Sequence, residues 1–246
     1  MLIKSQVKYI QSLGHKKFRD AGGVFVAEGP KIVEELLKSD AARLVEAYAT
    51  GDWLRDNQER VSHHQNIIEI GQRDLERISF LSTPSKVLAI FKKPVFPAIS
   101  KPEGITLLLD NIQDPGNLGT MVRTADWFGA KQVICSLETA DVFSPKVVQS
   151  TMASLARVQV LYRELEELLR GNREVPVYAA LLDGQDLREF QRVPQAFILI
   201  GNESRGIRPE LQALATHRIR IPGSGSAESL NAAVAAGILL FLIQKT

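Results

Sequence analysis

The sequence predicts an α/β protein with two domains, and three observations support this prediction. Short apolar strand candidates alternate with helical segments along the 246-residue chain. In the second half these strands, such as 105–109 and 196–200, are apolar throughout, which is typical of a parallel sheet covered on both faces. Between the halves, residues 93–103 are rich in proline and lysine and have no periodicity. We therefore predict domains at 1–92 and 104–246, joined by a linker.

The first domain is expected to be a small three-layer α/β unit. At its start, Val7, Ile10, Leu13 and Phe18 recur at roughly helical spacing, and this face should pack. The opposite face would be basic through Lys4, Lys8, Lys16, Lys17 and Arg19. Strands are predicted at 24–27, 44–49, 67–70 and 87–91, and helices at 31–38, 52–60 and 72–81.

The second domain should be a mainly parallel sheet with helices on both faces. Its predicted strands are 105–109, 132–135, 158–161, 177–182, 196–200 and 217–221. Its predicted helices are 118–128, 145–155, 164–169, 209–214 and 226–244.

One strand–loop–helix unit concentrates polar groups at a strand end. The apolar run 105–109 is followed by the loop DNIQDPGN and then by a helical pattern that carries Arg123. Ligands of open α/β sheets bind outside the carboxyl ends of the strands. Asn117 and Arg123 are therefore site candidates, although an exposed arginine on a helix is equally compatible with a solvated surface.

Two further segments complete an ordered set of motifs. The chain reads DNxxDPGNxGxxxRxA, then IGNExxG at 200–206, then IPxxGxxxSLNxxVA from Ile221. In this order the three motifs resemble those of the SpoU (TrmH-like) RNA 2'-O-ribose methyltransferases of the SPOUT class. The segments FVAEGPKIVEELL and STPSKVLAIFKKP also resemble the N-terminal substrate-binding domain of many SpoU enzymes, whose fold is similar to a ribosomal RNA-binding protein.

The resemblance implies a fold that spacing alone would not suggest. Spacing favours an unknotted doubly wound sheet, because knots are very rare. SPOUT proteins instead have a deep C-terminal trefoil knot and pair as homodimers through the last helix. The apolar positions Leu230, Val234, Gly237, Ile238 and Phe241 are compatible with such an interface, and equally with the core of a monomer.

The resemblance also assigns catalytic roles. It implies that Arg123 contacts the 2'-hydroxyl or its phosphate, that Asn117 orients the nucleotide, and that Glu203 holds Arg123 by charge-assisted bonds. Ser229 and Asn231 would support the loops. A guanidinium remains protonated at neutral pH, so we expect Arg123 to stabilise a developing alkoxide rather than to accept the proton.

The implied cofactor is S-adenosylmethionine, held mostly by main chain. By resemblance its pocket includes the loop near Leu181 and the main chain at Gly201, Ile221 and Leu230. A glycine at 201 would let the chain approach the ligand closely. Two positions depart from the family pattern, since Gly223 replaces a methionine and Ala233 replaces a serine.

Composition excludes several classes of protein. The net charge of +2 is too small to indicate nucleic-acid binding by itself. The single cysteine, Cys135, lies in an apolar run and is expected to be a buried thiol in a reducing cytoplasm. The N-terminus lacks the apolar core of a signal peptide, and the longest apolar segment, 230–243, is too short to span a membrane. The four histidines are scattered, and no metal site is expected.

Three alternatives remain at this level. The substrate, expected to be ribosomal RNA, could instead be transfer RNA. The protein could be a non-catalytic RNA-binding or ribosome-assembly module, since fold does not fix function. A dinucleotide site at 221–233 is disfavoured because the third glycine of GxGxxG would fall at Glu228.

Overall fold

The computed structural model describes residues 2–96 and 103–244, which form two compact units. Unit 1 consists of the chain up to Phe96 together with residues 141–156, and unit 2 contains the remainder. The predicted domain boundary falls between them, but its linker lies largely at 97–102, outside the described residues. Lys93 belongs to unit 1, where its ammonium bonds Asp20 at 2.6 Å.

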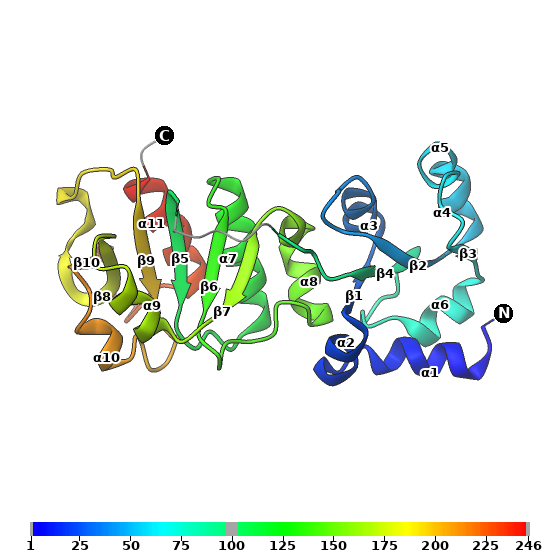
Figure 1. Ribbon diagram of the computed structural model, residues 1–246, viewed down its shortest axis with the longest axis horizontal. Helices are drawn as coiled ribbons and strands as arrows, with labels where there is room; N and C mark the ends of the chain where they lie inside the picture. The colour runs from blue at the N-terminus through cyan, green and yellow to red at the C-terminus, as the bar shows by residue number, and fades with distance from the viewer. Residues whose placement is uncertain (1, 97–102, 245–246) are drawn as a thin grey trace. The chain divides into compact units, whose positions relative to one another are not determined.

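Unit 1 is built on a four-stranded sheet with the order β1-β4-β2-β3 (Figure 1). Strand β4 is antiparallel to β1 and β2, whereas β2 and β3 are parallel. The carboxyl ends of β1, β2 and β3 therefore lie at one edge of the sheet. The elements are α1 (Lys4–Ser12), α2 (Lys16–Gly22), β1 (Val24–Glu28), α3 (Pro30–Leu37), β2 (Leu44–Ala49), α4 (Gly51–Asp56), α5 (Gln58–Val61), β3 (Ile67–Glu69), α6 (Gln72–Ile78) and β4 (Val87–Lys92).

The N-terminal helical segment differs from its predicted pattern. A break after Ser12 divides it into α1 and α2, so the second helix begins with a new rotational phase. Phe18, predicted to pack, is 46% exposed, and Arg19, predicted to be on the basic face, is only 2% exposed. The buried guanidinium of Arg19 donates to the Leu13 carbonyl at 2.7 Å and pairs with Asp141 at 2.5 Å.

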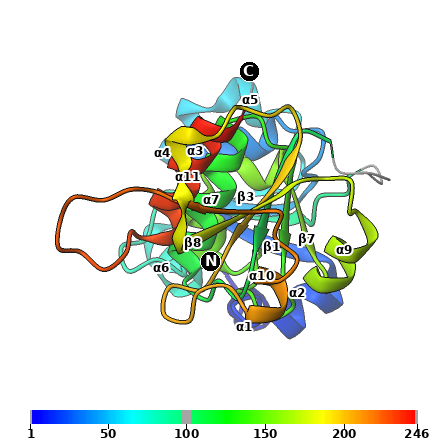
Figure 2. The ribbon, with the colours of Figure 1, turned by 90° about the vertical axis from the view of Figure 1, so that its left-hand side faces the viewer.

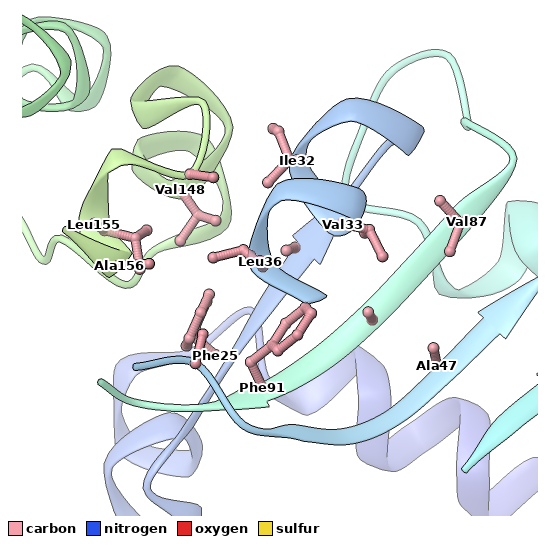
Figure 3. Close-up of a cluster of buried hydrophobic side chains, with 14 of the residues drawn as sticks. Phe25, Ile32, Val33, Leu36, Ala47, Val87, Phe91, Val148, Leu155 and Ala156 are labelled. Carbon is pink, nitrogen blue, oxygen red and sulfur yellow. The ribbon is translucent and has the colours of Figure 1, made fainter. Parts of the chain in front are cut away.

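The segment 141–156 extends the core of unit 1. Figure 3 shows Val148, Leu155 and Ala156 beside Leu36 of α3 and above Phe25 of β1. The predicted helix 145–155 is shorter in the structure. It forms α8 (Pro145–Thr151), then Met152 and Ala153 with left-handed φ of 49° and 71°, then a 3-10 turn, η1 (Ser154–Ala156). The sequence places these residues in the second domain, but their apolar side chains are buried in unit 1.

Unit 2 contains the remaining elements of the chain. They are β5 (Ile105–Leu109), α7 (Pro115–Trp127), β6 (Gln132–Cys135), β7 (Gln159–Tyr162), α9 (Leu165–Gly171), β8 (Val177–Asp186), η2 (Leu187–Glu189), β9 (Ala196–Ile200), α10 (Pro209–Gln212), β10 (His217–Arg220) and α11 (Ala232–Ile243).

The six strands form a fully parallel sheet with the order β10-β8-β9-β5-β6-β7, which confirms the predicted α/β class. One face packs on α9 and α10 through a cluster that includes Leu108, Leu165, Leu199 and Leu211. Helices α7 and α11 pack against each other and against β6 and β9, respectively. Every residue of β5 and β9 is buried, as their continuous apolar runs predicted.

Two helices begin three or more residues from their predicted starts, and both have an asparagine or aspartate cap. Helix α7 begins at Pro115 rather than 118, because the Asp114 side chain caps it and proline suits the first turn. Helix α11 begins at Ala232 rather than 226, with Asn231 as its cap. Residues 223–231 are exposed, and Figure 2 shows this segment as an orange-red loop extending away from the sheet.

Two further sequence predictions concern burial. Cys135 is buried, as predicted, and burial raises the pKa of its thiol. None of the helices within the described ranges combines the length and hydropathy needed to cross a bilayer.

The buried Arg19–Asp141 ion pair predicts a large effect of truncation. Asp141→Ala leaves the guanidinium buried without its partner, and we expect a loss of about 3–5 kcal/mol in the stability of unit 1. The exposed pair of Asp20 is the control, and Asp20→Ala should cost less than about 1 kcal/mol. Urea unfolding followed by Trp53 fluorescence checks this, and equal effects of the two substitutions would contradict it.

Candidate functional site

The site lies where the carboxyl ends of β5 and β9 meet in the sheet. Leu109 of β5 is level with Ile200 of β9, and the Asp110 amide donates to the Ile200 carbonyl at 2.8 Å. The chain order reverses here, since β6 and β7 lie on one side of β5 and β9 lies on the other. Such a switch point is the usual ligand site of an open parallel sheet.

An ion pair between a buried carboxylate and a partly exposed arginine joins the two loops that leave these strands. Asp110 has 0% exposure, and its carboxylate accepts from the Arg208 backbone amide at 2.9 Å and from Arg208 Nε at 2.8 Å. A buried carboxylate needs a partner, and Arg208 meets it with both main chain and side chain. This pair fixes the end of the loop 201–208 against the end of β5.

Asparagine side chains tie the same loops together a second time. Asn202 Nδ2 donates to the Asn111 carbonyl at 2.8 Å, while its Oδ1 accepts from the amides of Ser204 and Arg205. Asn111 has a φ of 57°, a left-handed conformation that asparagine tolerates better than most residues. Its amide donates to Ser136 Oγ at 2.9 Å, which anchors the turn to the end of β6.

Asn117 is the centre of a polar network that spans the three motifs. Its backbone amide donates to Asp114 Oδ1 at 2.8 Å. Its side chain donates from Nδ2 to Glu203 Oε1 at 2.7 Å and accepts at Oδ1 from Asn231 Nδ2 at 2.9 Å. Because an ionised carboxylate can only accept hydrogen bonds, the Asn117 side chain is oriented with Nδ2 toward Glu203 and Oδ1 toward Asn231. The two hydrogen bonds therefore run in one direction, from Asn231 through Asn117 to Glu203.

Asn231 has two roles in this network. Its Oδ1 accepts from the amides of Ala233 and Val234 at 2.9 and 3.3 Å, which caps α11. Its Nδ2 is then directed at Asn117. The residue that starts the helix is therefore also the residue that links motif three to motif one.

The structure does not bring every predicted catalytic residue to this network. Arg123 is exposed and lies six residues beyond Asn117, about 9 Å along the axis of α7. Within the described residues Glu203 accepts from Asn117 and forms no ion pair with Arg123, so the expected Glu203–Arg123 contact stays a prediction. Ser229 lies in the exposed loop before α11.

The predicted cofactor residues lie at the same edge of three adjacent strands. Ala179 of β8 is level with Leu199 of β9 and with Arg218 of β10. Leu181 and Gly201 each follow two residues later. In β8, residues 180–184 leave the pairing with β10, which resumes at Gln185 opposite Ile219. Ile221 directly follows β10, and Leu230 lies near the end of the loop that leads to α11.

The structure gives the glycine at 201 a reason in addition to the predicted close approach to a ligand. A Cβ on Gly201 would lie 2.2 Å from the Gly206 carbonyl carbon and 2.3 Å from the Ile207 nitrogen. This second close approach is to the loop's own backbone, where Asn202 and Gly206 exchange two hydrogen bonds. A substitution at Gly201 would distort this loop and would not test a ligand pocket.

Sequence reasoning missed the residues that hold the loops. Asp114 followed by Pro115 is an N-cap and first-turn pair, a local signal that was available in the sequence. Asp110 directly after a fully apolar strand was also visible, as a polar group placed at a buried strand end. Its partner Arg208 had no local signal, since the two residues are 98 positions apart.

Two family models match the two parts of the chain. The SpoU rRNA Methylase family matches residues 104–241, and the MRM3-like substrate binding domain matches residues 4–89. Among curated proteins, the 23S rRNA (guanosine(2553)-2'-O)-methyltransferase RlmP of Bacillus subtilis is 32% identical over 241 residues. That match covers 96% of this chain and 94% of RlmP.

Solved structures with the same fold cover nearly the whole chain. A protein assigned to the TrmH family of RNA methyltransferases, from Porphyromonas gingivalis, has a TM-score of 0.86, 42% identity and coverage of 99% of this chain and 98% of its own. An AdoMet-bound rRNA methyltransferase from Sinorhizobium meliloti has a TM-score of 0.86, 32% identity and coverage of 98% and 95%.

The Asp110–Arg208 pair predicts how the second motif loop is held. Asp110→Ala should reduce stability by about 2–4 kcal/mol and weaken hydrogen-exchange protection across 202–208, since it removes two bonds to a buried charge. Asp183→Ala, which removes an exposed partner of Arg218, is the control. Mass-spectrometric hydrogen exchange on both variants checks this, and unchanged protection of 202–208 in Asp110→Ala would contradict it.

Proposed function

Because the chain belongs to the SpoU rRNA Methylase family, we propose that it transfers a methyl group from S-adenosylmethionine to a ribose 2'-hydroxyl of ribosomal RNA. The observation that carries the proposal is the network Asn231–Asn117–Glu203. It joins all three motifs at the edge of the sheet where the predicted cofactor residues also lie. Two relatives of similar length, RlmP and the Sinorhizobium protein, are named as rRNA methyltransferases.

The residues at this edge fit a cofactor held by main chain. Gly201 and Ile221 directly follow β9 and β10, Leu181 lies in β8 two residues beyond its last pair with β9, and Leu230 lies in the loop before α11, so backbone donors and acceptors converge there. The glycines at 223 and 225 have no atom within 4 Å of a Cβ position, which leaves the backbone of this loop sterically accessible. When bound, the cofactor supplies an electrophilic methyl group on a sulfonium.

The chain's own residues position the nucleotide. The reaction is an in-line displacement, in which the 2'-oxygen forms a bond to the methyl carbon, the carbon–sulfur bond breaks, and the hydroxyl proton is released. Asn117 is held on both sides by Glu203 and Asn231, so it presents a fixed amide toward the nucleotide at low entropic cost. Arg123 stabilises the developing negative charge on the 2'-oxygen or binds the adjacent phosphate, and a phosphate oxygen or water accepts the proton.

We further propose a homodimer formed through α11 and α7. Val234 and Phe241 on α11 are 51% and 58% exposed, and Trp127 at the end of α7 is 84% exposed. Phe241 lies 6.4 Å from Phe128 between ring centroids, so the two helices present one apolar surface. Such exposure is costly for a monomer and typical of an interface. Arg123 is on the same helix as Trp127. In a dimer formed through this helix, Arg123 of one chain would therefore lie close to the site of the other chain.

Three finer features belong to the same proposal. Unit 1 binds the RNA substrate, in line with the substrate-binding family that matches it. The chain follows a knotted path near its C-terminus, where α11 packs on α7 and the Val193 amide donates to the Ile243 carbonyl at 2.8 Å. The protein acts in the cytoplasm, where an rRNA substrate is available to it.

The test of the function is methyl transfer to RNA with a chemical readout of position. Ribosomal RNA, transfer RNA and no RNA are incubated with labelled S-adenosylmethionine, and the product is digested with alkali. A 2'-O-methyl group prevents cleavage at its own nucleotide, because the hydroxyl is the attacking group. We expect label in alkali-resistant dinucleotides from ribosomal RNA. Label in transfer RNA alone would assign transfer RNA as the substrate. Cofactor binding with no transfer to either RNA would support a non-catalytic module.

Arg123 gives the matched mutational test. Arg123→Lys keeps the charge but loses the planar fork, and we expect a fall in the transfer rate of about 10²–10³-fold, as for loss of an oxyanion donor. Arg173→Lys, an exposed arginine after α9, is the control and should retain the wild-type rate. Near-normal turnover of Arg123→Lys would exclude fork-shaped recognition by this residue.

The dimer is tested at the centre of its apolar surface. Phe241→Glu places a charge on the exposed face of α11 without disturbing its buried face, so the chain should remain folded but become monomeric. Analytical ultracentrifugation measures the mass, and circular dichroism measures the fold. We expect transfer activity to fall together with dimerisation. A wild-type protein that is monomeric at assay concentration, or an active monomeric variant, would exclude the dimer as the working form.

A further inference from the structure

Unit 1 contains a cavity, widely open to solvent, at the carboxyl edge of its own sheet. The cavity has a volume of about 530 Å³ and is lined by Thr50, Gly51, Asp52, Glu69, Ile70, Gly71 and Gln72. These residues follow β2 and β3, the parallel pair of the sheet, and the Ile70 amide donates to the Ala49 carbonyl at 2.9 Å between them. The volume is in the range of sites for small ligands, about 300 to 1,000 Å³.

The two carboxylates in the lining have different neighbours. Asp52 pairs with Lys86 at 2.7 Å, and this hydrogen bond holds the pKa of the Asp52 carboxyl below its ordinary value. Its charge is therefore matched by a neighbouring ammonium. Glu69 is exposed at the end of β3, and its Oε1 would lie 2.5 Å from a Cβ built on Gly51. The Glu69 carboxylate thus lies against the backbone of Gly51 in the cavity lining.

Three cationic side chains lie around the cavity and offer donors to a nucleic-acid backbone, and one of them, Lys86, is paired with Asp52. Lys86 lies at the start of β4, and its carbonyl accepts from the Thr50 amide at 3.0 Å. Arg55 Nη1 would lie 3.4 Å from the same Cβ position on Gly51, and Arg73 is exposed in the first turn of α6. Cations beside a polar cavity bind phosphates of a strand whose base enters the cavity.

We propose that this cavity of unit 1 binds one unstacked guanine of the RNA substrate, whose Watson–Crick edge is read by Glu69. Ionised carboxylates only accept hydrogen bonds, and their two oxygens match two parallel donors. Guanine alone among the four bases presents two adjacent donors there, N1–H and the 2-amino group. Single-stranded RNA is recognised by bases turned out of the stack and bonded on this edge. The inference rests on the proposed role of unit 1 in RNA binding.

The direction in which one substitution changes RNA affinity distinguishes this proposal from nonspecific electrostatic binding. Glu69→Gln removes a negative charge near the RNA, and charge alone would then strengthen binding to phosphates. Direct reading of guanine predicts the opposite, because an amide offers one acceptor where guanine needs two. Glu76→Gln is the matched control, since it removes the same charge from the exposed surface of α6 outside the cavity lining.

The experiment uses the full chain and short fluorescent RNAs measured by anisotropy. The probes are seven-nucleotide uridine strands with one central guanosine, inosine or adenosine, and inosine differs from guanosine only by loss of the 2-amino group. For the wild type we expect guanosine to bind about tenfold more tightly than inosine, the value for one hydrogen bond to a charged group. Glu69→Gln should lose this preference, and Glu76→Gln should keep it.

A second variant displaces the Glu69 carboxylate by a substitution at the neighbouring Gly51. Gly51→Ala adds a methyl group that displaces the Glu69 carboxylate, and the backbone at position 51 is not in a left-handed conformation. It should also lose the guanosine preference while circular dichroism stays unchanged. No preference in the wild type, no binding of any probe, or a Glu69→Gln variant that behaves like Glu76→Gln would each overturn the proposal.

Methyl transfer on the same preparations keeps the two proposals distinguishable. Transfer to ribosomal RNA without a guanosine preference would reject the cavity and retain the methyltransferase. A guanosine preference without transfer would retain the cavity and reject the enzyme.

Discussion

The buried carboxylate of Asp110 is the constraint on which the site depends. It stands at the end of a strand with no exposure to solvent, so its charge has to be met inside the protein. Arg208 meets it with its backbone amide and its guanidinium, and the loop 201–208 is thereby held beside the end of β5. Glu203 belongs to that loop. Its contact with Asn117 follows from this anchoring and from the register of β5 and β9, in which Leu109 pairs with Ile200.

The same polar side chains start helices and build the site. Asp114 caps α7 and holds the amide of Asn117, while Asn231 caps α11 and donates to the Asn117 side chain. A cap fixes the first turn of its helix, so side chains located there are positioned by backbone geometry rather than by flexible loops. This explains how three motifs that are far apart in the chain give one ordered network, although residues 223–230 before Asn231 are exposed.

Both units place polar groups at the carboxyl ends of parallel strands, but with different chemistry. In unit 2 the ends of β5 and β9 carry an asparagine-centred network that suits orientation of a ribose and its phosphate. In unit 1 the ends of β2 and β3 carry Glu69 and the Asp52–Lys86 pair, which suits reading of a base. Segment 141–156 also shows that sequence order and packing differ, since it follows β6 in the chain but is buried in unit 1.

The sequence by itself determined the fold class, the strands, and the motifs that identify the family, because these depend on local apolar runs and short ordered patterns. The continuous apolar runs of β5 and β9 predict a covered parallel sheet, and the motifs indicate Asn117, Glu203 and Asn231 as site residues. Only the tertiary structure decided their partners. The pairing of Asp110 with Arg208, the burial of Arg19 against Asp141 and the position of Arg123 outside the network depend on the register of strands and the phase of helices. Those are set by packing between residues about a hundred positions apart, and no local pattern encodes them.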